Sequence, residues 1–169
     1  MSTLARGWKR SLFSVIAASF ALFCQARAEA ATTTTTFNVS LTITASCTVS
    51  ATALSFGSSG VIAASIDNTS TVTVTCTNTT PYNVGLDAGT ATGATVTTRK
   101  MTSGGATVSY ALYQNVGRTT NWGNTVGTDT VAGTGSGSAQ AVTVYGRVPA
   151  QSTPAPGAYS DTITVTVTY

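Results

Sequence analysis

The sequence contains no histidine and few charged residues of either sign. Only eight basic and five acidic side chains occur in 169 residues, and the acidic ones stand singly along the chain. Without imidazole, Ser-His-Asp and Cys-His catalytic sites are excluded. A zinc site would lack its usual ligands, and no spacing of the carboxylates favours a glycosidase pair. We therefore expect no catalytic residues, no metal site and no bound cofactor.

Long apolar runs are also scarce, and the one near the N-terminus is short. It covers residues 12–23, follows three basic residues, and is well short of the roughly 20 residues that span a bilayer. The small residues Ala26 and Ala28 have the spacing that a signal peptidase requires. The pattern predicts a secretory signal peptide over residues 1–28, cleaved between Ala28 and Glu29, with a cut two residues later as the alternative.

Removal of this segment changes the charge balance. Four of the eight basic residues leave with it, so four basic residues face five acidic ones in the mature chain. Arg99 and Lys100 are then the only adjacent basic pair. Binding to nucleic acid requires clustered cations that neutralise phosphates. We therefore expect no nucleic-acid partner.

The sequence has three cysteines, of which Cys24 falls within the expected signal peptide. Cys47 and Cys76 remain in the exported chain, where an oxidising compartment favours a disulfide between them. Two free, buried thiols are the alternative. A disulfide closing a loop of this length contributes about 3 to 4 kcal/mol to stability in the chain-entropy model.

After the signal peptide the apolar residues alternate with a period of two, which is typical of strands with one buried face. Turn-forming stretches rich in Gly, Asn and Pro separate these segments. Short strands at such spacing predict a β-sandwich or a barrel. Expected strands lie at residues 70–76, 82–86, 107–112, 141–148 and 161–169.

One acidic residue interrupts the last of these patterns. Asp161 shares the inward parity of Ile163 and Val165, which would place a carboxylate in the core of a regular strand. Burying an unpaired charge is costly. We therefore expect the regular strand to begin after Asp161, with this residue at the rim of the sheet or in the preceding turn.

The stretch "TTTTTFNVSLTITASC", residues 32–47, also alternates, but it lacks the features that protect an exposed strand. Strand edges are normally blunted by charge or proline, because an open edge is a template for another chain. No charged residue occurs between Glu29 and Asp67, and no proline precedes Pro81. The segment is therefore expected to be enclosed by something.

Several segments together resemble the spore coat protein U family, the major pilins of archaic chaperone-usher systems. After the alternating N-terminal strand come "SCTVSATALSFG", "TVTVTC", "YNVGLDAG", "SYALYQN" and "VYGRVPAQSTPAPGAYSDTITVTVTY". The resemblance covers essentially the whole mature chain, and its C-terminal block is the most specific part. That block contains Gly146, Pro149, Pro156, Gly157, Tyr159, Asp161 and the closing Tyr169.

The resemblance implies an all-β, incomplete immunoglobulin-like β-sandwich that lacks its last strand. It also implies a donor-strand extension over residues 29–45 and a pilin domain over residues 46–169. In such a chain the extension completes the sandwich of the next subunit. The implied donor side chains are Phe37, Val39, Leu41 and Ile43. The implied acceptor groove and chaperone contact are formed by Ile163, Val165, Val167 and Tyr169.

The implied function is that of a structural major pilus subunit for adhesion and biofilm formation. Its implied partners are further copies of itself joined head to tail, a periplasmic chaperone, an outer-membrane usher, and tip or minor pilins. The implied location is the surface of a Gram-negative bacterium, reached through the periplasm. One alternative is a spore coat structural protein. Another is a monomeric secreted carbohydrate-binding module that uses exposed Tyr113, Trp122 or Tyr145.

Overall fold

The computed structural model describes residues 29–169. The expected signal peptide, including Ala28 of its cleavage site, lies outside the described residues. The chain divides into two units between Ser40 and Leu41, and the fold below belongs to the second. Every regular element of the described part is a strand. No helix in residues 29–169 is long and apolar enough to cross a membrane.

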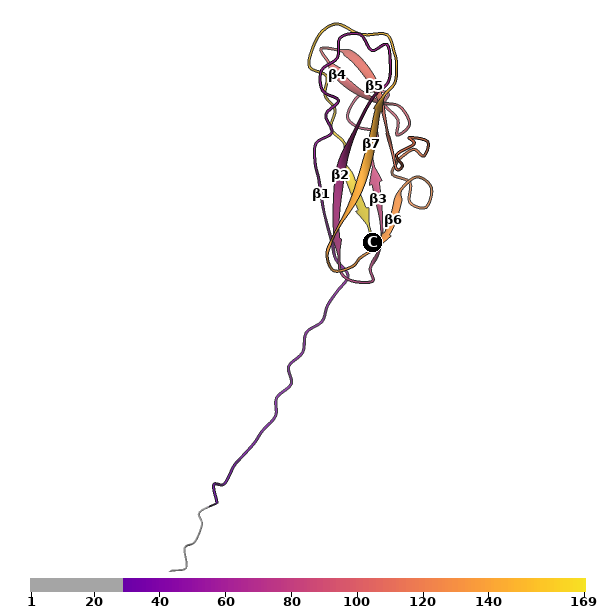
Figure 1. Cartoon of the computed structure of the whole chain (residues 1–169). Coiled ribbons are helices and arrows are strands. Elements are labelled where there is room, and N and C mark those ends of the chain that lie inside the picture. Colours follow the sequence, from indigo (N-terminus) through magenta and orange to yellow (C-terminus); the bar gives the residue numbers. More distant parts are fainter. Residues whose placement is uncertain (1–28) are drawn as a thin grey trace, which may run out of the picture. The chain divides into compact units, whose positions relative to one another are not determined.

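The strands form two antiparallel sheets (Figure 1). The larger sheet has the order β1-β2-β7-β5-β4, and the smaller has the order β6-β3-β8. The strands of the larger sheet are β1 (Cys47–Ala51), β2 (Ile66–Cys76), β4 (Arg99–Ser103), β5 (Ala106–Tyr113) and β7 (Ala139–Val148). Those of the smaller sheet are β3 (Pro81–Leu86), β6 (Val131–Thr134) and β8 (Val165–Thr168).

The core lies between the inward faces of the two sheets and follows the period-two pattern. On β2 the side chains of Val72, Val74 and Cys76 are fully buried, while the threonines between them face outward. Pairing of β2 with β7 over residues 66–75 fixes the register, because a slip of one residue would turn every apolar side chain to solvent. The other buried apolar residues include Tyr82, Val84, Leu86, Val108, Tyr110, Leu112, Val144 and Val148.

All five strands expected from alternation are present, and the last is shorter than the pattern suggested. Strand β8 begins at Val165, so the expectation that Asp161 precedes the regular strand is confirmed. Strands β1, β4 and β6 were not expected. They are only 5, 5 and 4 residues long, and "RKMTS" and "VAGT" carry too little alternation to reveal a strand.

The expected disulfide joins Cys47 to Cys76, and free thiols at these positions are thereby excluded. The two residues are direct partners at one end of the β1–β2 ladder. Thr77 reinforces the same end: its N–H donates to the Ser46 carbonyl oxygen, and the Ser46 N–H donates to its Oγ1. The start of β1 is thus fastened to the end of β2 by one covalent bond and two hydrogen bonds.

Replacing both Cys47 and Cys76 with alanine should lower the free energy of unfolding. The cysteines are 29 residues apart, and a loop of that length corresponds to about 3 to 4 kcal/mol. Urea unfolding of the mature chain, with and without reductant, measures the loss. Reductant should destabilise only the wild type. A variant as stable as the oxidised wild type would contradict the expectation.

Candidate functional site: an apolar cavity beside the C-terminal strand

The domain contains an open cavity of about 1080 Å³. Its floor is formed by core side chains of the larger sheet, which are almost completely buried. One rim is residues 51–60, and the other is residues 153–165. The apolar side chains that line it include Leu54, Phe56, Ile66, Val72, Met101, Val108, Leu112, Val144, Val148 and Tyr159.

The first rim contains no strand beyond Ala51, but it packs closely on the sheet. Leu54 and Phe56 take up the space above Gly146 of β7, where a Cβ atom would lie 2.5 Å from Leu54 Cδ2. Phe56 also meets Tyr110 edge-to-face, with their ring centroids 6.2 Å apart. Leu54 and Phe56 remain only half-buried, so this rim presents apolar surface to the cavity.

The second rim leads into β8, which lies at an edge of the smaller sheet. Its register partner is β3, from Val165 opposite Leu86 to Thr168 opposite Asn83. The other side of β8 has no strand partner among the described residues. Figure 1 shows the segment before β8, drawn in yellow, passing across the end of the domain where β4 and β5 lie. The domain therefore offers an unpaired strand edge next to apolar surface.

The four residues expected to form the acceptor groove differ in their positions relative to the cavity. Ile163 and Val165 line the cavity. Val167 is half-buried against the core without lining the cavity, and the Tyr169 side chain is 59% exposed. The structure therefore brings two of the four residues to the cavity itself.

The four residues expected to act as a donor strand are all exposed. The exposed fractions are 85% for Phe37, 84% for Val39, 84% for Leu41 and 70% for Ile43. None lies in a strand. Side chains of this size are rarely exposed in an alternating series unless they contact a partner. They provide a regular apolar stripe that the core of the domain does not use.

Polar contacts hold the second rim in place. The carboxylate of Asp161 accepts a hydrogen bond from the Tyr110 hydroxyl at 2.7 Å and another from the Thr90 N–H at 2.9 Å. Asp87, just past β3, accepts hydrogen bonds at Oδ1 from the N–H groups of Gly89 and Thr164, each at 3.0 Å. Both carboxylates serve as acceptors for backbone or hydroxyl donors.

These contacts shift two pKa values. Burial raises the pKa of Tyr110 well above its ordinary value, and the hydrogen bond to Asp161 raises it further. Burial alone would raise the pKa of Asp87, but the hydrogen bonds from Thr164 and Gly89 outweigh it and lower the pKa below its ordinary value. The Tyr110 phenol is therefore a permanent donor at neutral pH, and Asp87 is a permanent acceptor.

Arg99 is completely buried behind this rim, although the sequence suggested only an adjacent basic pair. Its guanidinium donates to the backbone carbonyls of Leu86, Asp87, Val96 and Trp122 at 2.7 to 2.9 Å. Burial lowers its pKa, while Tyr110 and nearby carboxylates act in the opposite direction. Arg99 therefore anchors the chain at the end of β3. The sequence around Arg99 gave no indication of this role, because the carbonyls it binds are brought together only by the fold.

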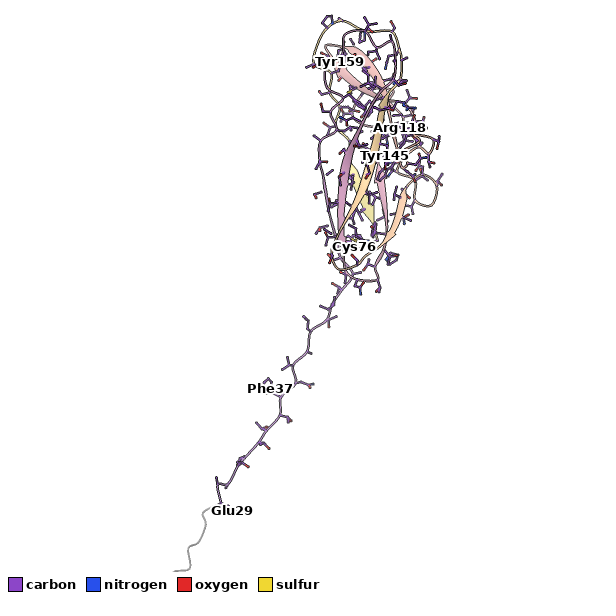
Figure 2. The ribbon with its side chains drawn as sticks, viewed as in Figure 1. Glu29, Phe37, Cys76, Arg118, Tyr145 and Tyr159 are labelled. Atoms are coloured by element: carbon purple, nitrogen blue, oxygen red, sulfur yellow. A yellow bond between two sulfur atoms is a disulfide. The ribbon has the colours of Figure 1, made fainter. Side chains whose placement is uncertain are left out.

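The aromatic residues considered for carbohydrate stacking do not form an exposed platform. Trp122 is fully buried, and its Nε1–H donates to the Val84 carbonyl oxygen at 2.8 Å, so its expected exposure is wrong. Tyr113 and Tyr145 are opposite partners on β5 and β7 and are half-buried. The guanidinium of Arg118 lies 5.8 Å from the Tyr145 ring centroid, and Figure 2 labels both residues.

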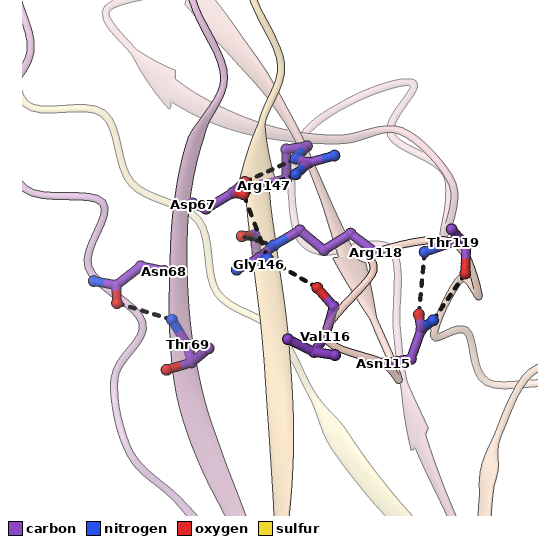
Figure 3. A network of polar contacts seen from close by, with 9 residues as sticks. All are labelled: Asp67, Asn68, Thr69, Asn115, Val116, Arg118, Thr119, Gly146 and Arg147. Carbon is purple, nitrogen blue, oxygen red and sulfur yellow. Dashed lines mark hydrogen bonds and ion pairs between the residues drawn. The ribbon is translucent and has the colours of Figure 1, made fainter.

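The outer face of the larger sheet carries an ion-pair network (Figure 3). Both Asp67 carboxylate oxygens accept hydrogen bonds from Arg147 at 2.7 Å, and Arg118 Nη1 lies 3.4 Å from Asp67 Oδ2. Arg118 also donates to the Gly146 and Val116 carbonyls. The charged groups of this network are paired with one another. Through Arg118 the network also connects the loop over residues 115–121 to β7. Within residues 29–169, His, Cys, Asp and Glu form no group of three that could hold a metal ion.

Comparison with known proteins identifies the family. Residues 33–166 match the model of the Spore Coat Protein U domain. The chain is 33% identical to Protein U of Myxococcus xanthus over 128 residues, which cover 69% of this chain and 71% of that protein. The chain therefore belongs to the Spore Coat Protein U domain family, as the sequence resemblance predicted.

A solved structure shows a similar fold. It is the crystal structure of the CsuC–CsuE chaperone–tip adhesion subunit pre-assembly complex from archaic chaperone-usher Csu pili of Acinetobacter baumannii. The TM-score is 0.56 at 25% identity, over 76% of this chain. The match spans only 40% of the solved chain. The expected fold class, an incomplete immunoglobulin-like sandwich with one disulfide, is confirmed.

The lowered pKa of Asp87 predicts acid sensitivity. The unfolded chain takes up a proton at this carboxyl at a higher pH than the folded chain does. Its contribution to stability is therefore complete above about pH 4 and is lost as the pH falls through the folded-state pKa. Asp87→Asn should show a shallower loss of the free energy of unfolding between pH 5 and about pH 2. Urea titrations across this range test it, and identical pH slopes would count against it.

Proposed function

We propose that this chain is a structural subunit of a chaperone-usher pilus that polymerises by donor-strand complementation. The observation that carries the proposal is the apolar cavity beside the unpaired edge of β8. An edge strand next to apolar surface is a site for strand addition, in which main-chain hydrogen bonds provide affinity and side-chain pockets provide specificity. Membership of the Spore Coat Protein U domain family supports the same function.

The occupant of the cavity is residues 37–43 of another copy, which we call the donor segment. Its four apolar side chains are exposed, share one parity and lie outside the core of the domain. Burying them contributes about 6 to 12 kcal/mol before ordering costs, at roughly 1.5 to 3 kcal/mol per side chain.

Head-to-tail insertion of this kind does not close on itself, so it produces an open fibre. In this proposal residues 29–45 are the extension, residues 46–169 are the pilin domain, and residues 1–28 direct export. Ile163, Val165, Val167 and Tyr169, which lie in β8 and directly beside it, form the acceptor groove and the chaperone contact. A periplasmic chaperone lends a strand to the cavity until an outer-membrane usher exchanges it for the donor segment of the next subunit.

We further assign the chain to the repeating shaft of the fibre. The donor segment and the cavity occur on the same chain, which suits a shaft subunit contacting its own copies and the tip or minor pilins. The fibre then serves adhesion and biofilm formation at the surface of a Gram-negative bacterium. A spore coat role, which the family name suggests, would use the same association in a different host. The burial of Trp122 disfavours a monomeric carbohydrate-binding module.

Leu41→Lys should abolish polymerisation, because it places an unpaired charge in an apolar cavity. Thr42→Lys is the matched control: the same charge stands one position later, where the period-two alternation turns it away from the cavity. Size-exclusion chromatography with light scattering on the purified mature chain reports the oligomer distribution. The expected result is multimers for the wild type and Thr42→Lys, and monomers for Leu41→Lys.

Deleting residues 32–43 provides an independent test. The shortened chain should still be exported and bind its chaperone, but should give no fibres in electron micrographs of cell surfaces. Fibres assembled from the deletion variant would rule out the donor role. A wild-type chain that remains a stable monomer with cooperative unfolding would favour the carbohydrate-binding alternative.

A further inference from the structure

The part of the cavity rim that precedes β8 is held without a strand ladder. Residues 160–164, which we call the wall segment, end where β8 begins, and Asp161 and Ile163 both line the cavity. Pairing with β3 starts only at Val165. In the wall segment the sole bridge among the described residues is the isolated one between Ser160 and Thr102. Other contacts must therefore define the position of this wall.

Two carboxylates provide these contacts, one from the wall segment and one from the loop that it faces. Asp161 Oδ1, in the wall segment, accepts hydrogen bonds from the N–H of Thr90 at 2.9 Å and from its hydroxyl at 3.0 Å. Asp87, in the loop that contains Thr90, accepts a hydrogen bond from the N–H of Thr164 at 3.0 Å. The Asp87 N–H in turn donates to the Thr164 carbonyl oxygen at 3.1 Å. Each segment thus holds the other through a side chain.

Tyr110 connects this pair of segments to the floor of the cavity. Its hydroxyl donates to Asp161 Oδ2 at 2.7 Å, and its side chain lines the cavity. Its ring also contacts Phe56 of the opposite rim. A single floor residue therefore touches both rims, and its bond to Asp161 sets the distance between the wall segment and the floor.

The local backbone is shaped to receive the Asp161 carboxylate. Gly89 has a φ of +82°, and a Cβ atom there would lie 2.0 Å from Asp161 Oδ2. Any other residue at this position would displace the carboxylate as well as strain the backbone. Behind it, Arg99 fixes the backbone carbonyls of Leu86 and Asp87. The charged and titratable groups around Asp161 are therefore Arg99, Asp87 and Tyr110, each with its own partner.

We propose that Asp161 is a positioning residue for strand capture. Together with Tyr110 and Thr90 it holds the wall segment at the edge of the cavity, in the shape that an incoming apolar strand requires. The occupant is the donor segment of a second copy, so the inference rests on the proposed function. A wall already in place removes an ordering cost from binding, and this preorganisation raises affinity without adding contacts to the ligand.

The test measures peptide capture by the full mature chain. Its own donor is disabled by Leu41→Lys, and this chain is the parent. The probe is a fluorescein-labelled peptide of residues 33–46 with the wild-type sequence, and fluorescence anisotropy gives its dissociation constant. Asp161→Asn and Tyr110→Phe are made singly and together in the parent. Asp67→Asn, which removes a carboxylate on the outer face of the sheet, is the matched control.

We expect Asp161→Asn to weaken peptide binding about tenfold or more, the effect typical of losing a hydrogen bond to a charged group. Tyr110→Phe should weaken it to a similar extent. The double variant should bind no more weakly than the weaker single variant, since both eliminate the same charge-assisted contact, one by removing the hydroxyl donor and the other by removing the charged acceptor. Asp67→Asn should bind within about twofold of the parent, because Asp67 does not line the cavity and its ion pairs lie on the outer face of the sheet.

A purely structural role for Asp161 would lower the urea midpoint but leave the affinity of the folded fraction unchanged, and that result overturns the inference. Additive effects of the two substitutions on affinity would overturn it as well. If Asp161→Asn fails to fold, the peptide affinity of Tyr110→Phe tests the inference by itself, because this substitution removes one hydroxyl and keeps the ring. Failure of the parent to bind the peptide would overturn the proposed function too, whereas equal binding by parent and variants refutes only the positioning role.

Discussion

The core of this domain is covered by one strand too few, and most other features depend on this constraint. The smaller sheet ends at β8, whose outer edge has no strand partner in the described part of the chain. Next to that edge lies apolar surface that water would otherwise contact. Burying it is favourable at roughly 25 cal/mol per Å² of apolar area, and an added strand also satisfies the free backbone groups of the edge. These two contributions are the physical basis of the proposed capture of an extended apolar segment.

Covalent and polar contacts stabilise both ends of this domain. The disulfide between Cys47 and Cys76 fastens β1 to β2 at one end. At the other end, Arg99 anchors four backbone carbonyls, and Asp87 and Asp161 hold the rim of the cavity. The few charges of the mature chain are therefore concentrated in structural contacts, including the Asp67–Arg147 pair on the outer face. Most of the charged side chains of the mature chain therefore take part in contacts that stabilise the fold.

Period-two alternation predicted the main strands because it reports directly which face of a strand is buried, as in Val72, Val74 and Cys76. It also predicted that the alternating segment from Phe37 to Ile43 is enclosed, whereas only the family resemblance implied that another copy encloses it. Alternation could not reveal the burial of Arg99 or Trp122, since each depends on backbone carbonyls of β3 that only the tertiary fold brings close. The contact between Thr90 and Asp161 joins residues 71 positions apart, and only the tertiary fold brings them together.

The central claim is that residues 37–43 fill the cavity of a different molecule. Site-specific photo-crosslinking tests it most directly, with benzoylphenylalanine in place of Leu41 in the otherwise unchanged mature chain. After irradiation, we expect a denaturation-resistant ladder of multimers whose crosslinks map to residues 51–60 or 153–165. Crosslinks confined to the monomer, or mapped to surfaces away from the cavity, would contradict the account.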